Sequence, residues 1–365
     1  MAKLTLRQIQ TQISSSSATW EAGATSIAEL SEAQQNRRLG LRVNEEEQRR
    51  IESYLRYERP STRFMFSQSR DWRNKDSNDW TTSIKDQGNC GSCVAFATVA
   101  TIEAQARIQH NKPDWKIDLS EADLFFCGAG RKCEEGWWPT EAMEYARTRG
   151  VSEELCFPYQ DHDMDCQTCS DRQQRLIMVK EYEEVIDPNA RKEFIDTIGP
   201  MVACLAVYRD FMFYKNGVYR HITGDLAGYH AVSCVGYSED EQCWICKNSW
   251  GPDWGDKGYF KIAYGESEID TRFAMYGVKR VDGPLIPDTD ETEAGDDWAE
   301  SLFAEHSFAP KRNLLWAYVK GRWRYQEVTE TELTGLGGIL FEAASVRAFF
   351  TGEKLNKLVA VKKYV

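Results

Sequence analysis

Residues 87–93, with the sequence QGNCGSC, place two thiols and two side-chain amides within seven positions. The stretch that follows repeats apolar residues at the spacing of a helix, at Ala95, Val99, Ile102 and Ala106. Cys93 is therefore expected at a helix N-terminus, where unpaired backbone N–H groups and the positive end of the helix dipole favour a thiolate. A sulfur in that state is nucleophilic at neutral pH, which is the chemistry of covalent catalysis.

Two later segments supply the groups that such a sulfur needs. His230 begins an apolar, strand-like run 137 residues after Cys93, and Asn248 ends another, 155 residues after it. These separations are close to the roughly 130–150 residues between the corresponding groups of papain-type enzymes. On these motifs, residues 71–278 resemble the papain family of cysteine peptidases, the group that includes the cathepsins.

The resemblance implies a role for each of these side chains. Cys93 would be the nucleophile, and His230 its general base and later its general acid. Asn248 would hold the imidazole in the correct tautomer. Gln87 would donate its side-chain N–H, together with the backbone N–H of Cys93, to the oxyanion of the intermediate. Trp250 resembles the indole that shields the His–Asn hydrogen bond from water.

A substrate cleft is implied by the same resemblance. Gly136 matches the glycine whose backbone pairs with an extended substrate. Trp137, with Ala231 and Ala274, would line the pocket for the side chain two residues before the scissile bond. Such a pocket is apolar, without a charge at its base, and should prefer a bulky apolar or aromatic side chain. The alternative for Trp137 is ordinary core packing.

The chain contains eleven cysteines, an odd number, as expected when the nucleophile is free. The resemblance implies bridges from Cys90 to Cys133 and from Cys127 to Cys166. Cys156 and Cys169 could form a further bridge. Three cysteines in strand-like runs are expected to be reduced core residues: Cys204, Cys234 and Cys246.

We expect neither a metal ion nor a cofactor. Cys243 and Cys246 have the spacing of a zinc motif, but alternation along a strand would direct the two thiols to opposite faces. No second pair of ligands lies nearby in the sequence. A zinc site at these cysteines is therefore disfavoured.

Length, composition and charge limit the number of domains, the classes of binding partner and the cellular compartment that we expect. A length of 365 residues predicts two or three domains, and 42% hydrophobic residues suffice for a sizeable core. The net charge of −12 argues against nucleic acid and anionic membranes as partners. Residues 1–20 show no signal-peptide pattern, so a cytoplasmic location or another export route is expected. Since disulfides usually need an oxidising compartment, the framework thiols would be reduced in the first case.

Residues 1–66 are predicted to be a propeptide that lies in the cleft and inhibits the enzyme. Residues 4–13 have a helical pattern, and Ser31 and Asn44 begin capping motifs of two more helices. Trp20 lies in a loop, looks exposed, and is a candidate for the residue that blocks the cleft. Self-cleavage is expected between about Arg56 and Arg70. The alternative is a permanent accessory arm.

The remaining boundaries follow from composition. Residues 67–281 would form the peptidase domain and residues 282–310 an acidic linker. Residues 311–365 would form a small α+β module of unassigned role, with hairpins over 314–328 and 346–365 and a helix over 331–344 between them. Four aromatic residues should share one face of its sheet, more often as core than as a ligand platform: Trp316, Tyr318, Trp323 and Tyr325.

The fold predicted for the whole chain is α+β and papain-like. A helical half would carry Cys93, a β-barrel-like half would carry His230 and Asn248, and the cleft would lie between them. The predicted function is that of a cysteine endopeptidase made as an autoinhibited precursor, acting on peptide or protein substrates. The alternatives are a peptide ligase or transpeptidase that uses the same acyl-enzyme, and a non-catalytic binding protein that keeps the fold.

Overall fold

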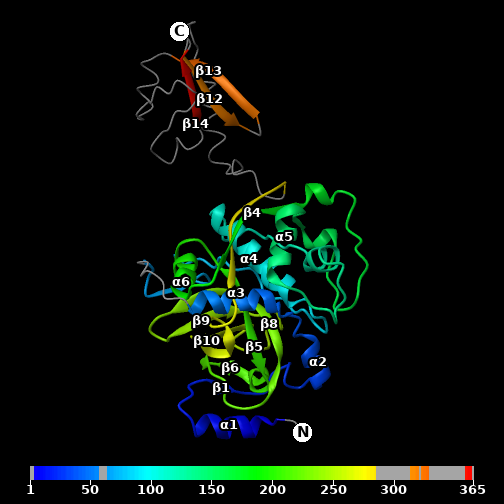
Figure 1. The fold of residues 1–365 in the computed structure, drawn as a ribbon. Helices are drawn as coiled ribbons and strands as arrows, with labels where there is room; N and C mark the ends of the chain where they lie inside the picture. Colours follow the sequence, from blue (N-terminus) through cyan, green and yellow to red (C-terminus); the bar gives the residue numbers. More distant parts are fainter. Residues whose placement is uncertain (1–3, 57–63, 285–312, 320–321, 329–357, 364–365) are drawn as a thin grey trace. The chain divides into compact units, whose positions relative to one another are not determined.

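The computed structural model describes residues 4–56, 64–284, 313–319, 322–328 and 358–363 (Figure 1). The chain divides into two units, residues 1–286 and 287–365. In the first unit, the helices are α1 (Leu6–Ser14), α2 (Glu32–Arg37), α3 (Glu45–Arg56), α4 (Cys93–Gln109), α5 (Pro139–Thr148) and α6 (Pro188–Thr197). None of the described helices is both long and apolar enough to cross a membrane.

The expected helix after the QGNCGSC motif is α4. It begins at Cys93 itself, and its predicted apolar residues are buried. Its polar residues Glu103, Gln105 and Arg107 are buried as well, because the helix is covered on all sides, including by the strands β8 (Leu226–Ser238) and β11 (Met275–Asp282). A helix enclosed in this way holds its first turn, and with it Cys93, in one position.

The larger sheet of the first unit has nine strands. Eight follow the order β3-β4-β11-β5-β8-β9-β10-β7, and β2 pairs with β8 beside this path. The expectation of a barrel-like half is corrected, since among the described strands this sheet is open, with short β3 and β7 at its two ends. The other strands of the sheet are β2 (Ser69–Asp71), β3 (Val151–Ser152), β4 (Leu176–Val185), β5 (Met201–Tyr208), β7 (Val218–Tyr219), β9 (Cys243–Lys247) and β10 (Tyr259–Ala263).

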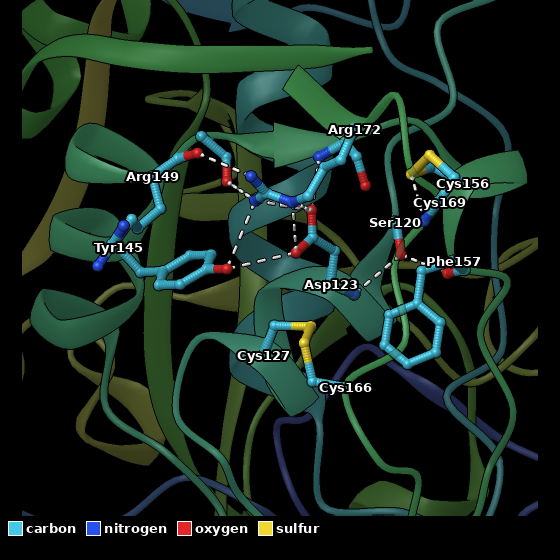
Figure 2. Close-up of a disulfide and its surroundings, with 12 residues drawn as sticks. Ser120, Asp123, Cys127, Tyr145, Arg149, Cys156, Phe157, Cys166, Cys169 and Arg172 are labelled. Carbon is cyan, nitrogen blue, oxygen red and sulfur yellow. Dashed lines mark hydrogen bonds and ion pairs between the residues drawn. A yellow bond between two sulfur atoms is a disulfide. The ribbon is translucent and has the colours of Figure 1, made fainter. Parts of the chain in front are cut away.

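Three disulfides stabilise the helical half. The two implied bridges, Cys90–Cys133 and Cys127–Cys166, are present. The further bridge, Cys156–Cys169, is present too, and Figure 2 shows it near the second of these. Between them, the carboxylate of Asp123, in the π-helix Asp123–Cys127, accepts hydrogen bonds from the guanidinium of Arg172 at 3.0 and 3.2 Å.

The remaining cysteines of the chain are free and buried: Cys93, Cys204, Cys234, Cys243 and Cys246. The prediction that three of these are reduced core residues is therefore confirmed. The compartment in which the protein works stays a prediction.

The arm formed by residues 4–56 contributes three helices and one strand. The predicted helix over residues 4–13 is confirmed as α1, and Ser31 forms the expected capping box with Gln34. Asn44 accepts hydrogen bonds from the first turn of α3 through its side chain. The strand β1 (Glu21–Ala22) pairs antiparallel with β6 (Tyr214–Asn216), which anchors the arm to the β-rich half.

The prediction that Trp20 is exposed is wrong. Its side chain is 1% exposed and packs against Tyr219 and Tyr214, with ring centroids 5.2 and 6.3 Å away. Its indole N–H donates to the carbonyl of Arg220. Trp20 therefore lies in the core of the β-rich half, and it is not the residue that covers Cys93.

The second unit contains β12 (Asn313–Val319), β13 (Arg322–Val328) and β14 (Leu358–Lys363). The predicted hairpin is confirmed by the antiparallel register, in which Trp316 stands opposite Tyr325 and Tyr318 opposite Trp323. β14 pairs antiparallel with β12. The predicted helix over 331–344, the first strand of the second hairpin and most of the predicted linker lie outside the described residues.

Candidate active site

The structure places His230 and Asn248 in contact, and it places the Cys93 thiol beside the backbone of Ala231, the neighbour of His230. Cys93 is the first residue of α4, His230 lies in β8, and Asn248 directly follows β9, the neighbour of β8 in the sheet. Nε2 of His230 lies 2.8 Å from Oδ1 of Asn248. Since Oδ1 is an acceptor and also accepts from the backbone N–H of Ser249, the imidazole proton is assigned to Nε2. Nδ1 then carries the lone pair that a base needs.

An indole, that of Trp250, and a side-chain amide, that of Gln87, enclose the His230–Asn248 pair. Trp250 is buried, and its ring centroid lies 4.8 Å from that of His230 at an interplanar angle of 36°. Gln87 is also fully buried, and its Oε1 accepts a hydrogen bond from Ser249. This contact orients the Gln87 amide so that its N–H groups face the carbonyls of Cys90, at 2.8 Å, and Arg38, at 3.0 Å.

The arm passes over Cys93 at residues 38–42, where the backbone of Gly40 lies close to the thiol. Besides the contact of the Arg38 carbonyl with Gln87, the Gly40 carbonyl accepts from Trp137 N–H at 2.8 Å, and Arg42 N–H donates to the Trp137 carbonyl at 3.0 Å. On the opposite side, Leu41 N–H donates to the carbonyl of Tyr229. The covering residues of the arm are therefore 38–42, and not Trp20 as predicted.

Glycine is required where the arm crosses the cleft. A Cβ atom on Gly40 would lie 1.9 Å from the backbone oxygen of Gly91, far inside van der Waals contact. A Cβ on Gly136 would lie 2.2 Å from the backbone oxygen of Gly40, and Gly136 has φ of +61°. The two backbones approach so closely that neither residue has room for a side chain.

The covering segment changes the protonation state expected for Cys93. Burial raises the pKa of the Cys93 thiol to about 11, against the opposing effect of nearby backbone groups of Ala231 and Gly40. Burial also lowers the pKa of His230 to about 4, although its hydrogen bond with Asn248 acts in the opposite direction. The predicted thiolate is therefore wrong for the covered state, because the arm removes the solvent that would stabilise both charges.

The predicted pocket residues Trp137, Ala231 and Ala274 are buried in one apolar cluster, together with Leu41 of the arm. The Trp137 ring packs against Phe125, with centroids 6.3 Å apart, and its far edge points toward Gly128. The hydrogen bonds of Trp137 with the arm are made by its backbone. Its ring therefore packs as a core residue does, and its role in the pocket stays a prediction.

Sequence reasoning missed a cation beside this cleft. Arg272 donates to the hydroxyl of Tyr229 at 2.8 Å and to Oε1 of Gln48 in the arm at 2.9 Å. Its guanidinium lies 5.3 Å from the centre of the Tyr229 ring. The signal available in the sequence was that Arg272 precedes Phe273 and Ala274 in the segment assigned to the pocket.

A buried charge cluster behind Asn248 was also missed. Lys247 donates to Thr82 at 2.9 Å, and Thr82 donates to Glu103 of α4. Lys85 forms an ion pair with Glu121 at 2.9 Å. Burial raises the pKa of Glu121 to about 8 and lowers that of Lys247 to about 8. The cluster connects the end of β9 to α4, and its members are too far apart in sequence to form a motif.

The family follows from comparison with known proteins. The model of the papain family cysteine protease domain matches residues 66–278, more than half of the chain. The chain is 36% identical over 191 residues to cathepsin B-like CP3 of Giardia intestinalis, covering 49% of this chain and 63% of that protein. It is 36% identical to bovine pro-cathepsin H over 211 residues, 54% of this chain and 60% of that protein. The protein belongs to the papain family of cysteine proteases.

Solved structures agree on the fold. The procathepsin B S9 structure from Trypanosoma congolense superposes with a TM-score of 0.61 at 24% identity, covering 76% of this chain and 98% of that one. A digestive procathepsin L2 from Tenebrio molitor gives 0.62 at 24% identity, covering 75% and 89%. Both are precursor forms, so the fold that this chain shares includes a segment before the papain domain. The sequence matches span about three fifths of the relatives' own length.

Proposed function

We propose that the protein is a cysteine endopeptidase made as a latent precursor. The observation that carries the proposal is the hydrogen bond between Nε2 of His230 and Oδ1 of Asn248. This hydrogen bond leaves Nδ1 of the imidazole free to act on the thiol at the start of α4. The same residues lie beneath residues 38–42 of the arm, so the precursor excludes substrate from the nucleophile.

The proposed reaction begins when the arm leaves. Water and the helix N-terminus then stabilise the Cys93 thiolate, and Nδ1 of His230 receives the thiol proton. The sulfur attacks the carbonyl carbon of the peptide bond, and the imidazolium returns its proton to the leaving amine as the bond to nitrogen breaks. Water then attacks the acyl-enzyme with His230 as base, which releases the acid and restores the thiol.

Gln87 and Asn248 would support this reaction without forming covalent bonds. The side-chain N–H that now donates to the Arg38 carbonyl would donate to the oxyanion of the intermediate, a contribution of roughly 10²–10³ in rate for one donor. Asn248 would keep the proton of the imidazole on Nε2, and Trp250 would keep water away from that bond.

We further propose that the substrate residue two positions before the scissile bond is bulky and apolar. Leu41 supports this preference, because it is a buried apolar side chain of the arm in the same cluster as Ala231 and Ala274. Arg272 lies beside Tyr229 at this part of the cleft. A library of peptides that differ at this one position would test the preference, and selection of acidic residues would refute it.

Self-cleavage is proposed between about Arg56 and Arg70. Within this stretch, Met65 donates its backbone N–H to Glu193 and Ser67 bonds to Asp196, so the chain is attached to α6 from Met65 onward. Met65 itself is 69% exposed. A cut at or before this residue would free the arm and leave β2 in the sheet.

Replacing the three catalytic residues tests the proposed function directly. Cys93→Ala should abolish peptide hydrolysis with the fold intact, because no other group forms the covalent bond. His230→Ala should be equally severe, and Asn248→Ala milder, since the amide only orients the base. The rates are measured with a fluorogenic peptide, and mass spectrometry of the products separates hydrolysis from transpeptidation. Activity of Cys93→Ala within tenfold of the wild-type rate would refute the assignment.

A further inference from the structure

Arg38 occupies two parts of the site at once. Its carbonyl accepts the Gln87 amide N–H, and its guanidinium Nη1 lies 2.6 Å from Oδ1 of Asp86. The Arg38 side chain is 10% exposed and the Asp86 side chain 49% exposed. A basic side chain is therefore held against a carboxylate directly beside the residue that would bind the oxyanion.

Asp86 is held in place by the catalytic domain itself. Its Oδ1 also accepts the backbone N–H of Gly88 at 2.9 Å, and its backbone pairs with Trp250. Neither contact involves the arm. The carboxylate therefore keeps its position when Arg38 is absent.

The position of Asp86 along the cleft identifies which side of the substrate it meets. In the arm, Leu41 and Arg42 pair with Tyr229 and Trp137, on the side proposed for residues before the scissile bond. Asp86 contacts the other end of the covering segment, next to Trp250. Asp86 thus faces the part of a substrate that follows the scissile bond.

We propose that Asp86 is a specificity-determining residue that binds an arginine or lysine side chain of the substrate on the leaving-group side, next to the scissile bond. In the precursor, Arg38 fills this subsite. The proposal deepens the proposed function and rests on it. The subsite requires one group of the substrate: a positively charged side chain that is long enough to reach the Asp86 carboxylate when the substrate backbone lies beside Gln87.

The ion pair between Arg37 and Glu134 provides a comparison for the Arg38–Asp86 pair. Arg37 and Glu134 approach to only 3.6 Å, with side chains 51% and 79% exposed. Exposed pairs of this kind contribute little to stability, because solvent screens them. The Arg38–Asp86 pair is closer and less exposed, so its effect should exceed that of Arg37–Glu134, which provides a matched control.

The first measurement uses the intact full chain and needs no turnover. The rate of Cys93 alkylation by iodoacetamide is compared in Arg38→Gln, Asp86→Asn and the double variant, with Arg37→Gln and Glu134→Gln as controls. Loss of the pair should raise the rate about threefold to tenfold in each single variant, and the double variant should match the larger single effect. Control variants that raise the rate equally, or additive effects of the two partners, would overturn the pairing.

The second measurement uses the full chain after its own processing. Peptides that differ only in the residue after the scissile bond, Arg, Gln or Glu, are compared by kcat/KM. Wild type and Glu134→Gln should prefer Arg over Gln about threefold to tenfold, less at high salt, and Asp86→Asn should bring this ratio near one. Wild-type activity without preference for Arg, or a preference that Asp86→Asn retains, would overturn the proposal. Failure to cut any peptide would refute the proposed function. The alkylation rates would then still decide whether Asp86 binds the side chain of Arg38 in the precursor.

Discussion

Two parts of the N-terminal arm attach to the enzyme by different interactions. The part from α1 to β1 docks through burial, with Ile9 and Trp20 inside the apolar core of the β-rich half. The part at residues 38–42 binds mainly through backbone hydrogen bonds and the Arg38–Asp86 pair. Burial of an aromatic side chain contributes far more free energy than one exchanged hydrogen bond. The first part should therefore provide the affinity of the arm, and the second the blockage of the site.

The largest effect is expected from Trp20→Ala. Removing a fully buried tryptophan costs about 3–5 kcal/mol, and here it also removes the hydrogen bond to Arg220. The docked arm should open more often, so Cys93 of the full chain should be alkylated about 100-fold faster or more, as that free energy implies. Leu155→Ala, at an 83% exposed position outside the arm, is the control. A rate within twofold of wild type would show that Trp20 does not anchor the arm.

A smaller effect is expected from Gly40→Ala. The new methyl group would collide with the backbone of Gly91, so residues 38–42 should move away from the thiol while α1 and β1 stay docked. Overpacking of this kind typically costs about 1–3 kcal/mol, so alkylation of Cys93 should accelerate about tenfold to 100-fold. Gly23→Ala is the control, since its methyl group meets only the flexible side chain of Lys215. Unchanged alkylation with Gly40→Ala would contradict the close approach of the two backbones.

The smallest effect concerns pH and Glu47 in α3. Burial raises the pKa of this carboxyl group, as does neighbouring Glu184, while the hydrogen bond from Tyr276 opposes the shift. A raised pKa means that the docked arm prefers Glu47 in its protonated form. The contribution of protonated Glu47 to the stability of the docked arm is therefore fully present below the ordinary pKa of 4.5. It is lost as the pH rises through the raised pKa.

Glu47→Gln should remove that dependence. Hydrogen exchange in residues 45–56, corrected for the intrinsic effect of pH, should be about two- to threefold slower than in wild type at pH 7 and equal at pH 4. Glu46→Gln removes the same charge from an exposed position and should change nothing. Faster exchange in Glu47→Gln at pH 7 would show that the docked arm prefers the ionised carboxylate, contrary to the raised pKa of Glu47.

Much of the fold followed from local patterns. The helix at Cys93, the capping box at Ser31 and the hairpin of the second unit depend on residues close in the sequence. The cysteine pairing and the neighbouring positions of His230 and Asn248 were implied by the resemblance to a family, because their spacing is characteristic. These are the features in which local chemistry and tertiary structure agree.

The features that were missed depend on distant segments. Trp20 looked exposed because its partner Tyr219 is about 200 residues away and no pattern links them. The thiol was expected to be ionised because the helix N-terminus is local, whereas the cover at residues 38–42 is a tertiary contact that removes solvent. The buried network of Glu103, Lys247 and Glu121 joins three segments that are far apart in the sequence, so no local pattern links them.

The central claim is that the arm keeps Cys93 as a covered, neutral thiol. The most direct measurement is the rate of iodoacetamide labelling of Cys93 at pH 6, in the full chain and in a chain that begins at Ser67. Labelling should be slow in the full chain and about 100-fold faster or more in the shorter chain, because solvent and the helix N-terminus then stabilise the thiolate. The other free cysteines are buried and serve as the internal control. Equal, fast labelling of Cys93 in both chains would contradict the claim.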